Sequence, residues 1–399
     1  MVERTSSTIC LWVVRLDRYY CCPLCGKKPN EKQSDGSYCI FLGGKEPRKI
    51  ATTMAHGSPQ YKIYYTNTNT NANANASASA MVHTAMGETD VAITMAGILG
   101  TVIAMVAGLV AIQTPNKKDS ATVSSFLPSD KQQPSKRAYE LFVACYTPVW
   151  IFSFAIIVVF QLYEDFTAVT YLQVCGGLAL PFLLQPALLP TAGFHSPDAQ
   201  RPLFQRYAFK ANLWLAVYSF IGNYWYTHYF YSVLQVAYTM PSHRLNNVPI
   251  AMYFATHFYF STYHFWSNAL LRKVVTTYQA GVRRNALYAS VILAFAYFTA
   301  FAETLTISSY PYYSFQDRNM AYTVGSAFYG IYFLVSFPAF FCFDEDIDKV
   351  GSRQVTVWQV VVSSAGYGMI ILTLLDFVRL QLDVPLVVGS SNLVCTSNS

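Results

Sequence analysis

One glutamate in an otherwise apolar stretch is the first residue of this sequence that suggests chemistry. Glu303 lies in "TAFAETLTISSYPYYSFQDR", residues 299–318, among small, hydroxylic and aromatic side chains. Helical spacing puts it on one face with Ala296, Thr299 and Ala300, so a groove of small residues ends in the carboxyl. A carboxyl within a membrane segment is costly, and it forms an ion pair, reaches the interface or marks a site. Structural and functional interpretations of Glu303 are both open.

Polar side chains also mark the two apolar segments that precede Glu303. The segment that begins near Val248 carries a stripe at spacings of four, three and four residues, formed by His257, Ser261, His264 and Asn268. The segment before it presents Asn212, Ser219, Asn223 and Thr227 on one face, with His228 beside them. Interhelical hydrogen bonds alone explain such stripes. Three neighbouring segments can nevertheless bring these groups to the membrane level of Glu303.

The histidines do not predict a metal site. The chain has seven His and no H-x-x-H or H-x-x-x-H pair. His257 and His264 are two helical turns apart, about 10.5 Å along the axis, which is too far for them to share an ion from one helix. "CPLC", residues 22–25, is a lone C-x-x-C without a second pair at zinc spacing. Nucleotide-binding motifs and the G-x-S-x-G of serine hydrolases are missing as well. We expect no metal and no cofactor.

The remaining carboxyl, imidazole, amide and phenol groups suit proton transfer on a lipid. An apolar surrounding keeps a carboxyl in its protonated form, in which it acts as an acid. Aromatic faces stabilise a carbocation that forms beside them. These two properties together favour acid-catalysed chemistry on an apolar molecule.

The composition places these groups in a membrane. Of 399 residues, 53% are hydrophobic and 12% are charged, with 30 Tyr and 28 Phe. A hydrocarbon core about 30 Å thick needs apolar helices of about 20 residues. We expect an all-α fold, a polytopic bundle of seven or eight transmembrane helices, with spans at 91–112, 142–162, 169–190, 210–232, 249–270, 287–308, 321–343 and 357–378. The first span lacks aromatic residues and is expected to be an accessory segment before a seven-helix body.

The basic residues predict an orientation, because cytoplasmic loops hold an excess of Lys and Arg. One set of alternate loops holds thirteen of these residues, and the other holds only Arg244, Arg318 and Arg379. The richer loops are expected to face the cytosol, which puts Glu303 about one turn inside the opposite border. The formal net charge of +6 is spread between apolar segments and gives no sign of nucleic-acid binding.

The chain is expected to divide into four regions. Residues 1–89 include the low-complexity tract "TNTNTNANANASASA" and are expected to be disordered; a transit sequence and a true start at Met81 or Met86 are both open. Residues 90–133 hold the accessory apolar segment and a polar linker. Residues 134–385 form the membrane domain, and residues 386–399 form a short polar tail.

Four stretches within the membrane domain resemble one family. They are "SKRAYELFVACYTPVW" (135–150), "KANLWLAVYSFIGNYWYTHYFYSVLQVAYTMPSHRLNNVP" (210–249), "THFYFSTYHFWSN" (256–268) and "ETLTISSYPYYSFQDRNMAYTVGSAFYGIYFLVSFPAFFCFDE" (303–345). They closely resemble the cycloeucalenol cycloisomerases, the cyclopropyl sterol isomerases of sterol synthesis. The resemblance does not extend to the residues before the membrane domain.

This resemblance implies a multi-pass enzyme of the endoplasmic reticulum membrane, an isomerase of the intramolecular-lyase class that needs no cofactor. Its expected partners are a cyclopropyl sterol and membrane lipid. The family opens the 9β,19-cyclopropane ring of cycloeucalenol to give obtusifoliol. An acid protonates the bridging methylene carbon, positive charge develops at C9, and loss of the C8 proton leaves the 8(9) double bond. The reaction needs an acid shielded from bulk water and a base near C8.

Roles for single residues follow from this chemistry and from their positions. We expect Glu303 to be the acid, or to hold it. The groups expected to relay the proton or to take it from C8 are His228, His257 and His264. The groups expected to orient these residues, bind the sterol or line the path of the cation are Asn223, Asn247, Tyr224, Trp225, Tyr312, Tyr313 and, as a second carboxylate, Glu164. Asp317 and Arg318 are expected to form a loop ion pair.

Two other classes of protein use similar buried polar groups. A non-catalytic sterol-binding or sterol-sensing membrane protein stays open as the alternative, although the close match of the polar stretches favours catalysis. A transporter often shows inverted repeats with broken helices in matching halves. We find no such internal symmetry in this sequence.

Overall fold

The computed structural model describes residues 88–116, 124–188, 196–308, 310–315, 321–352 and 354–386, together with three short strands outside these ranges. The chain forms two compact units, Met1–Ala85 and Met86–Ser399. In the first unit β1 (Thr53–Ala55) pairs antiparallel with β2 (Ser58–Gln60). The disorder expected for residues 1–89 falls mostly outside the described residues.

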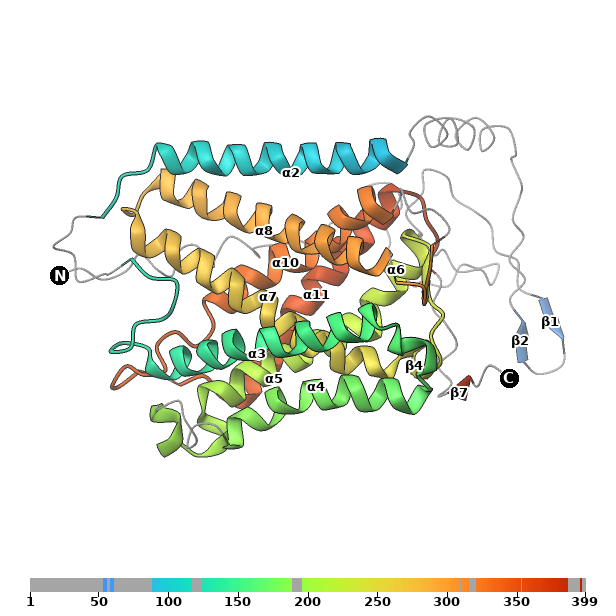
Figure 1. Ribbon diagram of the computed structural model, residues 1–399, viewed down its shortest axis with the longest axis horizontal. Coiled ribbons are helices and arrows are strands. Elements are labelled where there is room, and N and C mark those ends of the chain that lie inside the picture. The colour runs from blue at the N-terminus through green and yellow to red at the C-terminus, as the bar shows by residue number, and fades with distance from the viewer. Residues whose placement is uncertain are drawn as a thin grey trace, which may run out of the picture. The chain divides into compact units, whose positions relative to one another are not determined.

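The second unit is a bundle of long helices (Figure 1). The α-helices are α2 (Glu88–Ala111), α3 (Pro134–Val159), α4 (Ala168–Leu188), α5 (Tyr207–Ile221), α6 (Thr227–Val233), α7 (Ile250–Thr277), α8 (Val282–Ser308), α10 (Ser326–Phe341) and α11 (Val357–Gln381). Single π-helical turns, η4 (Gly222–Tyr226) and η5 (Ala321–Gly325), join α5 to α6 and lead into α10. Short 3-10 turns are η1 (Leu162–Asp165), η2 (Pro197–Gln200) and η3 (Leu203–Gln205). Every predicted span coincides with helical structure, so the prediction of a helical bundle is confirmed.

The predicted number of crossing helices is not confirmed. Five helical stretches in the described part of the chain are long and apolar enough to cross a membrane: Pro134–Val159, Ala168–Leu188, Val282–Ile307, Ala321–Phe341 and Val357–Gln381. α7 has 28 residues but is less apolar, because it carries the polar stripe of the second predicted segment. It contacts α3, α4, α5, α8 and α10, so these neighbours cover much of its surface. A helix shielded in this way does not need an apolar surface toward lipid.

Small residues bring α8 and α10 close together. Ala296 and Ala300 of α8 are buried, at 1% and 0% exposure. A Cβ added to Gly330 of α10 would lie 3.9 Å from the carbonyl oxygen of Ala296. The groove of small residues predicted beside Glu303 is therefore a helix-packing face, on which α10 lies. α2 runs along another side of α8 (Figure 1).

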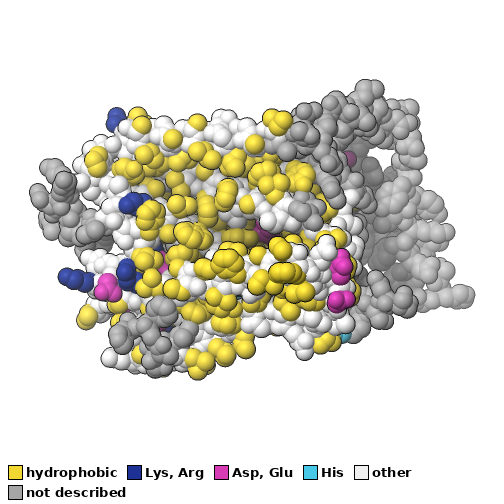
Figure 2. Space-filling view, in the orientation of Figure 1, with side chains coloured by type: hydrophobic (Ala, Val, Ile, Leu, Met, Phe, Trp, Pro, Cys, Tyr) yellow, Lys and Arg dark blue, Asp and Glu magenta, His cyan; other side chains and the backbone are white. Residues whose placement is uncertain are grey.

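The surface of the described residues has the pattern of a membrane protein. Figure 2 shows hydrophobic side chains over the middle of the bundle, and Lys and Arg gathered toward one end. Large apolar side chains are exposed on α3 and α11, among them Phe152 (68%), Val159 (74%), Trp358 (73%) and Phe377 (60%). Because lipid tails solvate such side chains and water does not, the apolar surface fits a bilayer.

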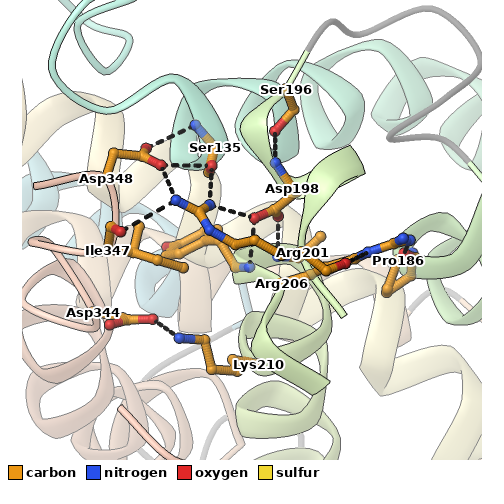
Figure 3. Close-up of polar contacts among 12 residues, drawn as sticks. Ser135, Pro186, Ser196, Asp198, Arg201, Arg206, Lys210, Asp344, Ile347 and Asp348 are labelled. Carbon is orange, nitrogen blue, oxygen red and sulfur yellow. Dashed lines mark hydrogen bonds and ion pairs between the residues drawn. The ribbon is translucent and has the colours of Figure 1, made fainter. Parts of the chain in front are cut away.

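One arginine joins four segments at the basic end of the bundle (Figure 3). Arg201 donates to Asp198 at 2.8 Å and to Asp348 at 2.8 Å, and also to the hydroxyl of Ser135 at the start of α3. Asp198 in turn accepts hydrogen bonds from the backbone N–H groups of Tyr207 and Ala208, so it caps the N-terminus of α5. The side-chain contacts therefore fix the starts of α3 and α5 to the connection between α10 and α11.

Further buried ion pairs lie at the same end. Lys210 of α5 pairs with Asp344, which follows α10. Arg272 of α7 binds Glu140 of α3 through two hydrogen bonds, of 2.7 and 2.8 Å. Glu140 is 1% exposed, and the Arg272 side chain is 7% exposed. Buried charges are tolerated only when they are paired in this way.

Replacement of Arg201 tests the importance of this network. In Arg201→Leu, the buried carboxylates of Asp198 and Asp348 lose their shared counter-charge, so we expect a loss of about 3–5 kcal/mol in the free energy of unfolding. The measurement is thermal or denaturant unfolding of the purified protein in detergent. Lys349→Leu is the control, because it removes an exposed pair whose side chains are 68% and 61% accessible. Equal destabilisation by both variants would contradict a structural role for the Arg201 network.

Candidate active site

A cavity lies at the other end of α8, where Glu303 is five residues from the helix C-terminus. It holds about 660 Å³ of space, part of which is open to the outside. The lining residues are Gly222, Asn223, Thr227, Phe230, Leu234, Tyr238, Thr256, Phe260, Glu303, Thr304, Ile307, Tyr313, Gly325, Tyr329 and Tyr332. The wall is thus mostly aromatic and aliphatic, with one carboxyl among the described residues.

Both π-helical turns of the bundle contribute to this wall. Gly222 and Asn223 come from η4, and Gly325 comes from η5. A π-turn accommodates one extra residue in a helix and is frequent at functional sites, because it changes the direction in which the following side chains point. After η4, Thr227, Phe230 and Leu234 of α6 line the cavity at helical spacing.

A pair of short strands closes another side of the cavity. β3 (Val236–Tyr238) pairs antiparallel with β6 (Tyr313–Phe315), and Tyr238 lies opposite Tyr313. The two rings are 5.1 Å apart, and both line the cavity. Because β3 follows α6 and β6 follows α8, this pairing ties together two segments that are far apart in the sequence. A cross-strand aromatic pair of this kind stabilises the contact by about 0.2–1 kcal/mol.

Glu303 is half-buried and is held by phenols. The hydroxyl of Tyr329 on α10 donates to its Oε2 at 2.9 Å, and the hydroxyl of Tyr263 on α7 also bonds to the carboxyl. The rings of Tyr329 and Tyr332 pack edge to face at 4.7 Å. No Lys or Arg of the described residues pairs with Glu303. Glu303 therefore differs from Glu140 at the basic end, which has an arginine partner.

This arrangement allows the carboxyl to give up and regain a proton. The apolar wall favours its neutral form, which is a proton donor. The phenol hydroxyls donate to the oxygens, so the carboxylate that remains after proton transfer is stabilised by hydrogen bonds. The aromatic faces around it can stabilise positive charge on a bound molecule. The site is suited to protonating an apolar ligand.

Comparison with known proteins identifies the family. Over 263 residues the chain is 41% identical to the cycloeucalenol cycloisomerase of Arabidopsis thaliana, covering 65% of this chain and 91% of that relative. The chain belongs to the cycloeucalenol cycloisomerase family. No protein-family model matches the chain, and no solved structure matches it.

Three of the residues predicted for this cycloisomerase-family site lie in the cavity wall. They are Glu303, Asn223 and Tyr313. Asn223 is 4% exposed, and its amide donates to Ser219 and, at 2.6 Å, to the hydroxyl of Thr256, which also lines the cavity. The cavity thus places an amide and a hydroxyl from η4 and α7 in the same wall as the carboxyl from α8.

The three predicted histidines lie outside the lining. His257 bonds to Asn212 at 3.2 Å and packs against Phe182 of α4. His264 is fully buried, with one ring nitrogen 2.7 Å from the carbonyl oxygen of Phe260 and the other 3.0 Å from the hydroxyl of Ser336. His228, on α6, faces Trp225 and Tyr231, away from the cavity side of that helix. The stripe on α7 is therefore a set of interhelical contacts, as the structural interpretation of its spacing allowed.

The other predicted substrate-binding residues also lie outside the lining. Asn247 is exposed in the turn between β4 (Ser242–Leu245) and β5 (Val248–Pro249), where Asn246 and Asn247 both have positive φ, 52° and 61°. Two such residues fit a tight hairpin, so the Asn pair is explained by turn geometry. Trp225 is 45% exposed, and its ring packs against that of Tyr224. Tyr312 packs against Tyr163. Glu164 is exposed on η1. Asp317 and Arg318 lie outside the described residues.

Sequence reasoning missed the phenols that hold Glu303. On α7 the side that faces the cavity carries Thr256, Phe260 and Tyr263. These residues are spaced like His257, Ser261 and His264 of the polar stripe, but each comes one residue earlier in the chain. A shift of one residue turns the face by about 100°. Tyr329 and Tyr332 of α10 were hidden among many aromatic residues. Only the hydrogen bond to Glu303 distinguishes Tyr329 from the others, and Tyr332 is recognised by its ring contact with Tyr329.

Possible metal ligands occur among the side chains of the described residues. Among the described residues, no group of three or more His, Cys, Asp or Glu side chains could hold a metal ion. Cys145 and Cys175 are free thiols. The described wall of the cavity offers a carboxyl, phenols, an amide and hydroxyl groups.

Removal of the His264 ring tests its structural role. In His264→Ala the hydrogen bond to Ser336 is lost and a hole forms among Trp214, Phe337 and Phe340, so we expect a loss of about 2–5 kcal/mol in stability. Unfolding in detergent, followed by tryptophan fluorescence, measures the change. Trp266→Ala, an exposed position on the same helix, is the control and should change stability little. A stable His264→Ala protein would contradict the structural role.

Proposed function

We propose that this protein is a cycloeucalenol cycloisomerase, which opens the cyclopropane ring of cycloeucalenol to give obtusifoliol. The observation that carries the proposal is a carboxyl without a basic partner among the described residues, in an aromatic cavity of a chain 41% identical to a cycloeucalenol cycloisomerase. The reaction is an isomerisation, so neither an oxidant nor a reductant is consumed. A proton donor and a proton acceptor in a dry cavity are sufficient for it.

Glu303 is the proposed acid. Its proton goes to the bridging carbon C19 as the bond between C9 and C19 breaks, and positive charge develops at C9. The rings of Phe230, Phe260, Tyr238 and Tyr332 lie in the same wall and supply electron-rich faces for that charge. A sterol that fills this mostly apolar wall displaces water from it, so the cation is protected from capture by a water molecule.

Asn223 and Tyr313 are proposed to contact the sterol. The amide of Asn223 and the hydroxyl of Thr256 form a polar spot in an otherwise apolar wall, which suits the single hydroxyl of a sterol. Tyr313 covers the cavity from β6. The apolar residues around these groups fit the ring system by burial of apolar surface.

The proposed setting is the endoplasmic reticulum membrane, with several crossings. Membrane lipid surrounds the apolar band of Figure 2, and the basic end faces the cytosol by the charge rule. Glu303 then lies near the luminal border, within reach of a sterol that is dissolved in the bilayer.

Conversion of the sterol tests the proposal. The full chain, expressed in a sterol-producing host supplied with cycloeucalenol, is expected to form obtusifoliol, measured by gas chromatography and mass spectrometry. Glu303→Gln should lower turnover by about 10²–10⁴-fold, because general acid catalysis contributes that much. Asp165→Asn, which changes an exposed carboxylate on η1, is the control and should keep full activity.

Two outcomes would contradict parts of this proposal. A folded parent protein that binds the sterol without converting it would exclude the isomerase and favour a sterol-binding protein. Full turnover by Glu303→Gln at equal protein level would keep the isomerase and exclude Glu303 as its acid.

A further inference from the structure

The reaction proposed above needs both a proton donor and a proton acceptor, but the described wall of the cavity offers one carboxyl and no histidine. Glu303 is that carboxyl, and His228, His257 and His264 all lie outside the lining. Asn223, Thr227, Thr256 and Thr304 are polar but do not accept a proton from carbon near neutral pH. The phenols of the wall are protonated in that range, so they are not available as the base. The described cavity thus holds fewer acid–base groups than a mechanism with separate acid and base requires.

We propose that the Glu303 carboxyl both delivers the proton to the sterol and takes the second proton back, with Tyr329 as the positioning residue that holds it between the two steps. This proposal rests on the proposed function. It assigns the roles of acid and base to one side chain, and it adds Tyr329 of α10 to the proposed active site.

The geometry of the substrate permits this double role. C8 and C19 are both bonded to C9, so the carbon that gains a proton and the carbon that loses one are close neighbours. In the first step the O–H bond of Glu303 breaks, the electrons of the C9–C19 bond form a new C19–H bond, and C9 becomes positive. In the second step the C8–H bond breaks, its electrons form the C8–C9 double bond, and the proton goes to the Glu303 carboxylate. The enzyme ends as it began, so no proton from solvent is required.

Tyr329 has the position that such a cycle requires. Its hydroxyl donates to Oε2 of Glu303 at 2.9 Å, and its ring is fixed by Tyr332 at 4.7 Å and by Phe333 at 5.1 Å. Between the two steps Glu303 is a carboxylate in a mostly apolar wall, where a charge without donors is costly. The phenol stabilises that carboxylate and restrains its rotation, so the same group stays beside C8 and C19.

Within the described residues, the titratable groups that interact with Glu303 are all phenols. They are Tyr259 and Tyr263 on α7, Tyr329 and Tyr332 on α10, Tyr238 on β3 and Tyr313 on β6. Phenols stay protonated across the neutral range. The phenols around Glu303 therefore contribute no limb to a pH profile in that range.

The test is the pH dependence of kcat/KM for the purified full chain acting on cycloeucalenol. Neither sterol ionises, so the profile over about pH 5 to 9 belongs to the protein. One carboxyl that starts protonated gives a plateau at low pH and a single fall at high pH. A separate base, which must start unprotonated, gives a bell-shaped profile with a second fall at low pH. Enzyme held at each pH must regain full activity at neutral pH, which separates titration from unfolding.

The plateau with one falling limb is the expected result, and a reversible bell shape would overturn the shared role. A bell whose acid limb vanishes in His228→Gln, His257→Gln or Asp317→Asn would identify the separate base. If the parent protein forms no obtusifoliol at any pH, the proposed function itself fails. The two failures are thus distinguishable.

Tyr329→Phe tests the positioning role. We expect kcat to fall about 10-fold with little change in KM, and the falling limb to move to higher pH, because the carboxylate loses a donor and the neutral acid is favoured. Tyr146→Phe is the matched control: Tyr146 is also half-buried, and its hydroxyl donates to the carbonyl of Leu178 at 3.0 Å, away from the cavity. An unmoved limb in Tyr329→Phe, with only lower stability, would contradict the positioning role.

Discussion

The guanidinium of Arg201 is the interaction on which the helix arrangement depends. It binds Asp198 and Asp348, and through them it fixes the N-termini of α3 and α5 against the segment that leaves α10. In a bilayer the hydrophobic effect does not hold helices together, because lipid tails are as apolar as the helix surfaces. Polar contacts and close packing therefore set which helices are neighbours. The buried pairs Lys210–Asp344 and Arg272–Glu140 act at the same end of the bundle.

The opposite end of the bundle is built differently, and this difference creates the cavity. Aromatic contacts, single π-turns and the short β3–β6 pair predominate there, beside the ion pair Asp376–Arg379 of α11. A π-turn prevents regular helix packing at the point where it occurs, so space remains beside Gly222 and Gly325. Glu303 is at this end. The charge-paired end thus supports an end that can hold an apolar ligand.

Aromatic residues have three separate uses in this protein. Outside the bundle, Phe152, Trp358 and Phe377 are exposed and suit contact with lipid. Inside it, Trp214, Tyr218, Phe337 and Phe340 surround His264 and make the core between α5, α7 and α10. A smaller set around Glu303 supplies the phenol donors. The count of 30 Tyr and 28 Phe could not separate these uses, because a residue count does not depend on where in the fold each ring lies.

The sequence by itself determined the helical segments, the membrane setting, the family and Glu303 as an isolated carboxyl. Each of these depends on local apolar runs or on residues quoted directly from the chain. The tertiary structure decided which polar residues share a space with Glu303: it placed Asn223, Tyr263 and Tyr329 there and kept His228, His257 and His264 out. The physical reason is that the spacing of residues along a helix tells which side chains share a face, but not which other element or cavity lies against that face. A rotation of one residue, about 100°, or one π-turn redirects a side chain from a packed contact to a cavity.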